Sequence, residues 1–283
     1  HEVVVLDDES SDAHEEFYWN EKAENHKVDI NEYEQIRCLF DGVDVVFHLA
    51  AEARIQPSIE NPLLAVKTNV LGTATVLQCA REAKAKRVVY SSTSSAYGLK
   101  NDPPLREDMP KDCLNPYSVS KTAGEELCLM YAGLFGLETV VFRYFNVFGE
   151  RQPLRGQYAP VIGIFLRQNA AGENLTIVGD GGQRRDFTHV SDVVRANISA
   201  SDMKNEKCVG NIINVGAGVN YSVNEVASFI SGDTVNLPPR PAEARETLAD
   251  TSLFYSTFEW KPRDILEEWI NAAMPEKVEK RYA

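Results

Sequence analysis

The sequence predicts an α/β protein with a doubly wound, mainly parallel sheet. Over the first 150 residues, four short runs rich in β-branched side chains alternate with longer segments of helical period. This alternation is typical of βαβ units, in which a helix connects two parallel strands. The runs are apolar almost throughout, which indicates strands that helices bury on both faces.

The expected elements follow in chain order. The strands cover residues 3–6, 45–50, 88–91 and 139–145. The two long helices cover about residues 60–84 and 116–134. Asn115 can cap the second helix, and Pro116 suits its first helical position.

After about residue 150 the amino-acid composition of the chain changes. Glycines, prolines and arginines cluster in residues 149–156, 179–186 and 238–245. Loops of this composition suit a lobe that closes on a ligand. We therefore expect residues 1–150 to form the sheet domain. Residues 151–283 should form mainly a smaller ligand-binding lobe, with some chain returning to the first domain.

The first expected strand is followed at once by Asp7, which suggests that it is the second strand of its sheet. In a doubly wound nucleotide-binding sheet the first strand lies centrally, and its following turn carries the glycine-rich loop. We therefore expect roughly 25–30 further residues upstream, the length of a strand, a glycine-rich turn and a helix.

Composition limits the partners. Acidic residues outnumber basic ones by 42 to 29, for a formal charge of -13, so we expect no nucleic-acid partner. The five cysteines are scattered and form no C-x-x-C pair, which favours reduced thiols in a cytoplasmic protein and no metal site. No uninterrupted apolar run of about 18 residues exists, so we expect no membrane span.

Two segments carry candidate chemistry. Tyr117 and Lys121 are spaced i,i+4 and share one face of the expected helix. A lysine cation ~4 Å from the phenol could lower its pKa of ~10 by about three units. Upstream, the strand at residues 88–91 leads into a hydroxyl-rich turn that contains Thr93. Alone, either pattern has an ordinary explanation: a chance pair on a surface helix, or a Ser/Thr turn bonding its own backbone.

Together the two segments resemble the extended short-chain dehydrogenase/reductase family, specifically its nucleotide-sugar epimerases and dehydratases. The resemblance implies a Rossmann-type fold and catalytic roles for Thr93, Tyr117 and Lys121. Asp7 would bind the adenosine ribose and repel a 2′-phosphate, so the implied cofactor is NAD rather than NADP. The other implied cofactor-binding residues, besides Tyr117 and Lys121, are Asp29, Ile30, Leu49, Ala50, Ala51, Asn69, Ser91 and Phe145. For Asn69, a satisfied amide in the core is an equally good interpretation.

The resemblance also implies how a nucleotide sugar is bound. An arginine fork suits phosphate oxygens, and an acid suits ribose hydroxyls. One departure is Gly163, which stands where the family often has proline. The implied substrate-binding residues are Thr93, Asn146, Val161, Thr176, Arg185, Arg240, Glu243 and Thr247.

Ser94 and Ser95 bear on the reaction. Dehydratases of this family resemble one another in placing Asp-Glu after the hydroxyl residue, and related decarboxylases often carry Glu there. A serine cannot act as the carboxyl acid or base of an elimination. The residues therefore favour NAD-dependent 4-epimerisation through a 4-keto intermediate. A decarboxylase or dehydratase of the same family, or a non-catalytic ligand-sensing member, remains an alternative.

The resemblance leaves two substrate pairs open. Thr247 stands at a position where the epimerases resemble one another in carrying a bulky tyrosine that excludes N-acetylated sugars. A threonine would leave room, so UDP-GlcNAc/UDP-GalNAc is expected beside UDP-glucose/UDP-galactose. A neutral replacement at Thr247 is an equally open explanation.

A homodimer is the expected assembly, formed through residues 60–84 and 116–134 as a four-helix bundle, as in the family. Both segments carry more apolar positions than one sheet-facing stripe requires.

Overall fold

The computed structural model describes residues 1–11, 13, 17–156, 159–230, 232–239 and 244–274. The chain forms two compact units and passes between them several times. The first unit comprises residues 1–96, 113–143 and 197–213, and the second comprises residues 97–112, 144–196 and 214–283. Residues 97–112 thus join the second unit although they precede residue 150, and Leu105 forms a bridge with Ala249 there.

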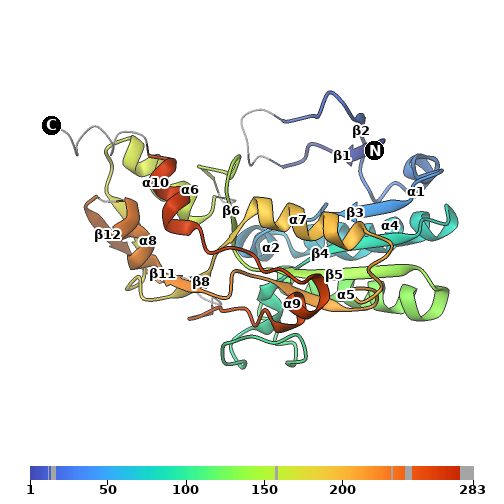
Figure 1. The fold of residues 1–283 in the computed structure, drawn as a ribbon. Helices are drawn as coiled ribbons and strands as arrows, with labels where there is room; N and C mark the ends of the chain where they lie inside the picture. The colour runs from blue at the N-terminus through green and yellow to red at the C-terminus, as the bar shows by residue number, and fades with distance from the viewer. Residues whose placement is uncertain (12, 14–16, 157–158, 231, 240–243, 275–283) are drawn as a thin grey trace. The chain divides into compact units, whose positions relative to one another are not determined.

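The first unit is built on a four-stranded sheet with the order β10-β5-β4-β3, of which β5 and β10 end in residues of the second unit (Figure 1). Its strands are β3 Val45–His48, β4 Arg87–Thr93, β5 Glu138–Tyr144 and β10 Ile212–Val215. β3 and β4 are parallel, with Val45 opposite Arg87 and His48 opposite Tyr90. Every residue of β4 is buried, as expected for a strand that is covered on both faces. The predicted α/β class is confirmed.

Two further strands form a separate small sheet. β1 Val4–Asp7 runs parallel to β2 Glu24–Lys27. β2 was not expected, because its sequence ENHK is polar and has no alternating apolar face. β3 has β4 as its only partner among the described strands, and Phe47 in β3 is 42% exposed. The upstream segment expected from Asp7 stays a prediction.

The helices of the first unit confirm the expected long segments. They are α1 Tyr33–Ile36, η1 Arg37–Phe40, α2 Ile55–Glu60, α3 Pro62–Val66, η2 Lys67–Leu71, α4 Gly72–Glu82 and α5 Pro116–Phe135. α5 begins as the sequence predicts, because the Asn115 side chain accepts a hydrogen bond from the Ser118 N–H at 2.9 Å. It ends at Gly136, whose φ of 69° lies in the left-handed region.

α3, η2 and α4 form one helical run interrupted by a wide turn. η2 is π-helical and contains Asn69. By length and composition alone, the helical run Pro62–Glu82 could cross a membrane, and half of its apolar window is buried inside the protein. Leu77 of α4 packs in a core with Ile36, Val88 and Val141. The expectation of no membrane partner stays a prediction.

The second unit combines three small sheets with helices. β6 Val147–Phe148 pairs with β9 Thr188–His189, β7 Leu175–Val178 pairs with β12 Thr234–Leu237, and β8 Arg184–Asp186 pairs with β11 Asn220–Ser222. The helical elements are η3 Ser94–Tyr97, α6 Val161–Ala170, α7 Val190–Ser201, α8 Val223–Ile230, α9 Ser252–Phe258 and α10 Leu266–Ala272, of which η3 and α7 cross the unit boundary. Phe165, Val226 and Ile270 lie in the core of this unit.

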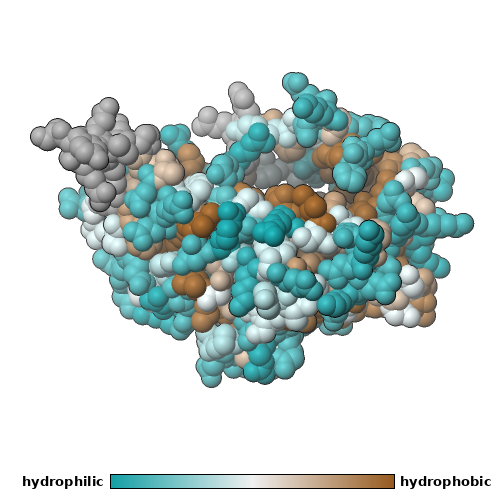
Figure 2. Space-filling view, in the orientation of Figure 1, coloured by the Kyte–Doolittle hydropathy of each residue, from teal (hydrophilic) through white to brown (hydrophobic). Residues whose placement is uncertain are grey.

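The face of the molecule drawn in Figure 2 is largely hydrophilic, with separate apolar areas between the polar side chains. Such a surface agrees with the 25% of charged residues in the sequence.

Candidate active site

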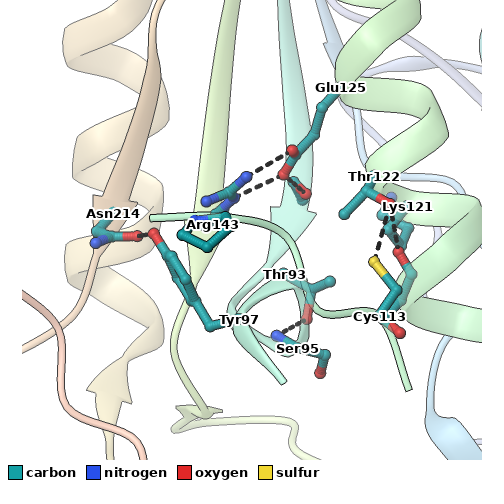
Figure 3. Close-up of polar contacts among 12 residues, drawn as sticks. Thr93, Ser95, Tyr97, Cys113, Lys121, Thr122, Glu125, Arg143 and Asn214 are labelled. Atoms are coloured by element: carbon teal, nitrogen blue, oxygen red, sulfur yellow. Dashed lines mark hydrogen bonds and ion pairs between the residues drawn. The ribbon is translucent and has the colours of Figure 1, made fainter. Parts of the chain in front are cut away.

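The end of β4 and the start of α5 bring the three predicted catalytic residues together in the first unit. Thr93 is the last residue of β4, Tyr117 is the second residue of α5, and Lys121 follows one turn later. The Thr93 hydroxyl lies near the Tyr117 phenol and favours its ionised form. The Thr93 Oγ1 also accepts a hydrogen bond from the Ser95 N–H at 3.1 Å (Figure 3). The motifs at residues 88–98 and 117–121 therefore meet as one cluster.

Lys121 is buried, and its ammonium group faces an aromatic ring. The side chain is 2% exposed, and Nζ lies 4.3 Å from the centroid of the Tyr90 ring. Burial lowers the pKa of Lys121 to about 7, although nearby Cys128 and Glu125 act in the opposite direction. A lysine of this kind loses its proton near neutral pH.

The pKa of Tyr117 is raised above its ordinary value. Burial is the main cause, and the Thr93 hydroxyl and the charge of Arg54 oppose it. The pKa of this phenol is thus raised in the structure, and the predicted effect of Lys121 on Tyr117 stays a prediction. Lys121 Nζ lies over the Tyr90 ring, and Arg54, which the sequence did not single out, is a further cation whose charge acts on Tyr117.

A buried ion pair supports this cluster from within the unit. Glu125 accepts hydrogen bonds from Arg143 Nε and Nη2, both at 2.8 Å, and from Ser92 Oγ at 2.6 Å (Figure 3). Both charged side chains are at most 1% exposed. The pair joins α5 to β4 and β5, the same elements that carry Tyr117 and Thr93. Sequence reasoning assigned no role to these residues, although a glutamate and an arginine inside mostly apolar runs were a usable signal.

A close contact between α5 and β4 depends on Gly124. A Cβ at this position would lie 2.2 Å from the Tyr90 hydroxyl oxygen, so no other residue fits without a shift. The same hydroxyl donates a hydrogen bond to the Lys121 carbonyl oxygen at 3.1 Å. Tyr90 therefore fixes the distance between the first turns of α5 and β4.

The predicted adenosine-side residues lie on β1 and after β2. Asp7 ends β1, where its Oδ1 accepts a hydrogen bond from the Glu9 N–H at 2.7 Å and burial raises its pKa. Asp29 accepts hydrogen bonds from Asn31 and forms an ion pair of 3.2 Å with Lys67. Ile30 is buried in the core of the unit.

Asn69 uses its amide within the protein. Its Oδ1 accepts a hydrogen bond from the Glu52 N–H at 2.8 Å, and its Nδ2 donates to the Glu52 carbonyl and to Ser120 Oγ. These bonds hold the loop after β3 against α5. They account for a buried amide at this position, while a contact to the cofactor stays a prediction.

The other predicted cofactor residues divide between the units. Leu49, Ala50 and Ala51 follow β3, and Leu49 is 60% exposed. Ser91 is buried in β4. Phe145 belongs to the second unit and packs there with Tyr97.

In the second unit, the structure brings Asn146 and Thr247 together. Asn146 Nδ2 donates to Thr247 Oγ1 at 3.4 Å and to the Asp186 carbonyl oxygen at 3.0 Å. Thr247 is 9% exposed, and its N–H donates to the Arg184 carbonyl oxygen. Arg185 follows in the same strand, β8. These three predicted substrate-binding residues therefore share one region.

The remaining predicted substrate residues lie elsewhere in that unit. Val161 begins α6, and Thr176 lies in β7 with its Oγ1 accepting a hydrogen bond from Gln168 Nε2 at 2.9 Å. Arg240 and Glu243 lie outside the described residues. Gly163 is required locally, because a Cβ there would lie 2.2 Å from the Pro153 carbonyl oxygen.

Asp186 is a structural centre that sequence reasoning missed. Its buried carboxylate accepts hydrogen bonds from the N–H groups of Ala217, Gly218 and Ala249 at 2.8–3.1 Å. Burial nevertheless raises its pKa to about 6. Among the residues that the structure describes, no group of three His, Cys, Asp or Glu side chains could hold a metal ion.

Comparison with known proteins agrees with this geometry. The family model described as the NAD dependent epimerase/dehydratase family matches residues 1–216. A putative UDP-glucose 4-epimerase of Methanocaldococcus jannaschii is 36% identical over 278 residues, which cover 95% of this chain and 88% of that protein. A UDP-N-acetyl-alpha-D-glucosaminuronate decarboxylase of Bacillus cytotoxicus is 44% identical over 195 residues, 66% of this chain and 58% of that protein. The crystal structure of the UDP-glucose 4-epimerase of Thermotoga maritima with UDP-glucose matches with a TM-score of 0.90 and 29% identity, covering 100% of this chain and 92% of that one.

The depressed pKa of Lys121 predicts a pH-dependent stability. The unfolded chain keeps a lysine pKa of ~10.4, so between pH 7 and 10 it binds more protons than the folded protein, and the free energy of unfolding rises with pH. Denaturant titrations should show the wild type gaining about 2 kcal/mol relative to Lys121→Met from pH 7 to pH 9. Lys22→Met, at an exposed position, serves as the control and should track the wild type. A constant difference between wild type and Lys121→Met would show that Lys121 keeps its proton.

Proposed function

Because this chain belongs to the NAD-dependent epimerase/dehydratase family, we propose that it interconverts the C4 epimers of a UDP-linked sugar. The observation that carries the proposal is the cluster of Thr93, Tyr117 and Lys121 at the junction of β4 and α5. Product NMR after incubation with NAD and a panel of UDP-sugars tests it directly, and a panel in which no sugar changes at C4 would refute it.

The residues of the first unit suit NAD. Asp7 offers a carboxylate at the end of β1, which favours ribose hydroxyls over a 2′-phosphate. The exposed Leu49 with the small Ala50 and Ala51 leaves the end of β3 open to a flat ring. When bound, NAD accepts a hydride from C4 of the sugar and returns it.

Residues of the chain itself transfer the proton of the sugar 4-hydroxyl. We propose that Tyr117 takes the proton of the sugar 4-hydroxyl and returns it after the other face of the sugar has been reduced. Thr93, whose hydroxyl lies near the phenol, can hold the sugar oxygen in place. The charge of Arg54 and the Thr93 hydroxyl favour the phenolate against the effect of burial.

Decarboxylation is the second candidate, because the decarboxylase of Bacillus cytotoxicus shares 44% identity with two thirds of this chain. Ser94 and Ser95 argue against it, since neither can act as the carboxyl group that the related decarboxylases carry after the hydroxyl residue. Loss of carbon dioxide from a uronic acid substrate, seen in the same NMR experiment, would decide for this candidate.

A change of Tyr117→Phe should lower kcat by at least ~10²-fold, because the variant loses only its proton-transfer group. Bound NAD, measured by absorbance of the released cofactor, should be retained. The exposed Tyr255→Phe is the matched control and should keep wild-type turnover. Near-normal turnover by Tyr117→Phe would remove Tyr117 from the mechanism.

For the substrate, we propose a UDP-sugar held in the second unit by Asn146, Arg185 and Thr247. An arginine at position 185 suits a diphosphate, and a threonine at position 247 is small enough to accept an N-acetylated sugar. Both UDP-glucose and UDP-GlcNAc therefore belong in the panel.

Thr247→Tyr should suppress turnover of UDP-GlcNAc more than that of UDP-glucose. Overfilling a packed site costs about 1–3 kcal/mol, so the ratio of the two kcat/KM values should shift by roughly 5- to 150-fold. Thr247→Val removes the hydroxyl that accepts from Asn146 without adding bulk, and it should leave the ratio unchanged. Equal losses on both sugars with Thr247→Tyr would show that this position does not select the sugar.

We also propose a cytoplasmic homodimer without nucleic-acid or membrane partners. The five free cysteines and the charge of -13 support this environment. Support for the dimer comes from apolar side chains that remain exposed on the helical run Pro62–Glu82 and on α5. They are Leu63, Leu64, Val66, Leu71, Val119, Met130 and Leu134.

Leu134→Glu should convert the dimer into a monomer, because a charge would be buried in the apolar contact. Sedimentation at micromolar concentration measures the change. Ile198→Glu alters an exposed apolar residue outside these helices and should stay dimeric. A monomeric wild type would contradict the proposal.

A further inference from the structure

Arg54 has a backbone conformation that is normally reserved for glycine. It lies between β3 and α2, with φ of 81° and ψ of 150°. In this region a Cβ is strained, and residues other than glycine are kept there mainly at functional sites. The strain would vanish with glycine, so the arginine side chain is the feature that needs an explanation.

The guanidinium of Arg54 makes no hydrogen bond or ion pair within the described part of the chain. The residue is accessible to solvent, although the surrounding chain lowers the pKa of its guanidinium. The other described arginines with exposed side chains include Arg37, Arg106 and Arg245, which each pair with a carboxylate. An arginine that is held in a strained position without such a pair is available to an anion from outside the protein.

The surroundings of Arg54 place that anion near the reacting hydroxyl. Ser58, one helical turn further along α2, accepts a hydrogen bond from the Tyr117 N–H at 3.1 Å, which fixes α2 to the first turn of α5. The charge of Arg54 is also the one that acts on the Tyr117 phenol. Arg54, at the start of α2, is therefore joined through Ser58 to the turn of α5 that carries Tyr117.

We propose that Arg54 is a specificity-determining residue that binds a carboxylate at C6 of the sugar, so that the preferred substrate is a UDP-linked hexuronic acid. This inference rests on the proposed function, because it takes the 4-hydroxyl as the group at Tyr117. C6 is attached to C5, next to C4, whereas the diphosphate is attached to C1 on the opposite side of the ring. Among the anionic groups of a sugar nucleotide, only the C6 carboxylate is this close to the 4-hydroxyl.

The test compares UDP-glucuronate with UDP-glucose, which differ only at C6, on the NAD-loaded protein. The variants are Arg54→Gln, Arg54→Lys and Arg54→Gly, with the exposed Arg37→Gln as matched control. Glycine suits the backbone at position 54, so Arg54→Gly should fold at least as well as the wild type, which a thermal melt verifies. Both kcat/KM and the Kd of each nucleotide sugar, by calorimetry on the Tyr117→Phe background, are measured.

The wild type should prefer UDP-glucuronate, and both Arg54→Gln and Arg54→Gly should reduce that preference by roughly 30- to 1,000-fold, as expected when one partner is removed from a charge pair that substrate binding shields from water. Arg54→Lys should restore part of it, and Arg37→Gln should match the wild type. The same losses should appear in the Kd of UDP-glucuronate.

Two outcomes would overturn the assignment. The first is an equal effect of Arg54→Gly on both sugars together with a shifted pH profile, which would show that Arg54 acts only through Tyr117. The second is a wild type that turns over UDP-glucose and binds UDP-glucuronate no more tightly, in which case the epimerase function stands and the acidic substrate falls. If neither sugar is turned over, the proposed function fails, while the ratio of the Kd values still decides whether Arg54 recognises the carboxylate.

Discussion

The buried ion pair between Glu125 and Arg143 is the interaction on which the first unit depends. It joins the middle of α5 to β5, and through Ser92 it also joins α5 to β4. Two charges with almost no exposure are tolerable only when each satisfies the other, so the three elements cannot slide apart without leaving a bare charge in the core. Thr93 and Tyr117 sit at the ends of the elements that this pair locks together. The nearness of these two side chains follows from that arrangement.

In the second unit, a single buried carboxylate holds the chain segments together in place of an ion pair. The Asp186 carboxylate accepts hydrogen bonds from three backbone N–H groups that belong to two separate segments. The side-chain amide of Asn146 donates a further hydrogen bond to the backbone carbonyl oxygen of Asp186. A single carboxylate thus organises the loops around Thr247 without any long strand pairing. The rise in the pKa of this carboxyl reflects how completely the surrounding chain excludes water.

Local sequence signals predicted the regular elements well. Asn115 and Pro116 specify the start of α5, and the apolar runs specify β4 and β5, because capping and burial on both faces depend on neighbouring residues alone. β2 escaped prediction because its polar residues are held by pairing with β1, a contact that no local pattern encodes. The upward shift of the Tyr117 pKa was not predicted, for a similar reason. Spacing placed Lys121 on the right face, but the position of its ammonium over the Tyr90 ring and the nearness of Arg54 depend on tertiary packing.

Because of the wide turn at η2, the helical run turns different faces toward the core before and after this turn. A π-helical turn holds one more residue than an α-helical turn, which rotates everything beyond it by about 100° relative to an unbroken helix. Before the turn, α3 directs Leu63 outward, and after it α4 directs Leu77 into the core. Deleting one residue from η2 would restore a regular helix but put its two halves out of phase with their surroundings. The number of residues in this segment is therefore constrained by the packing on both sides of it, in addition to the hydrogen bonds of Asn69.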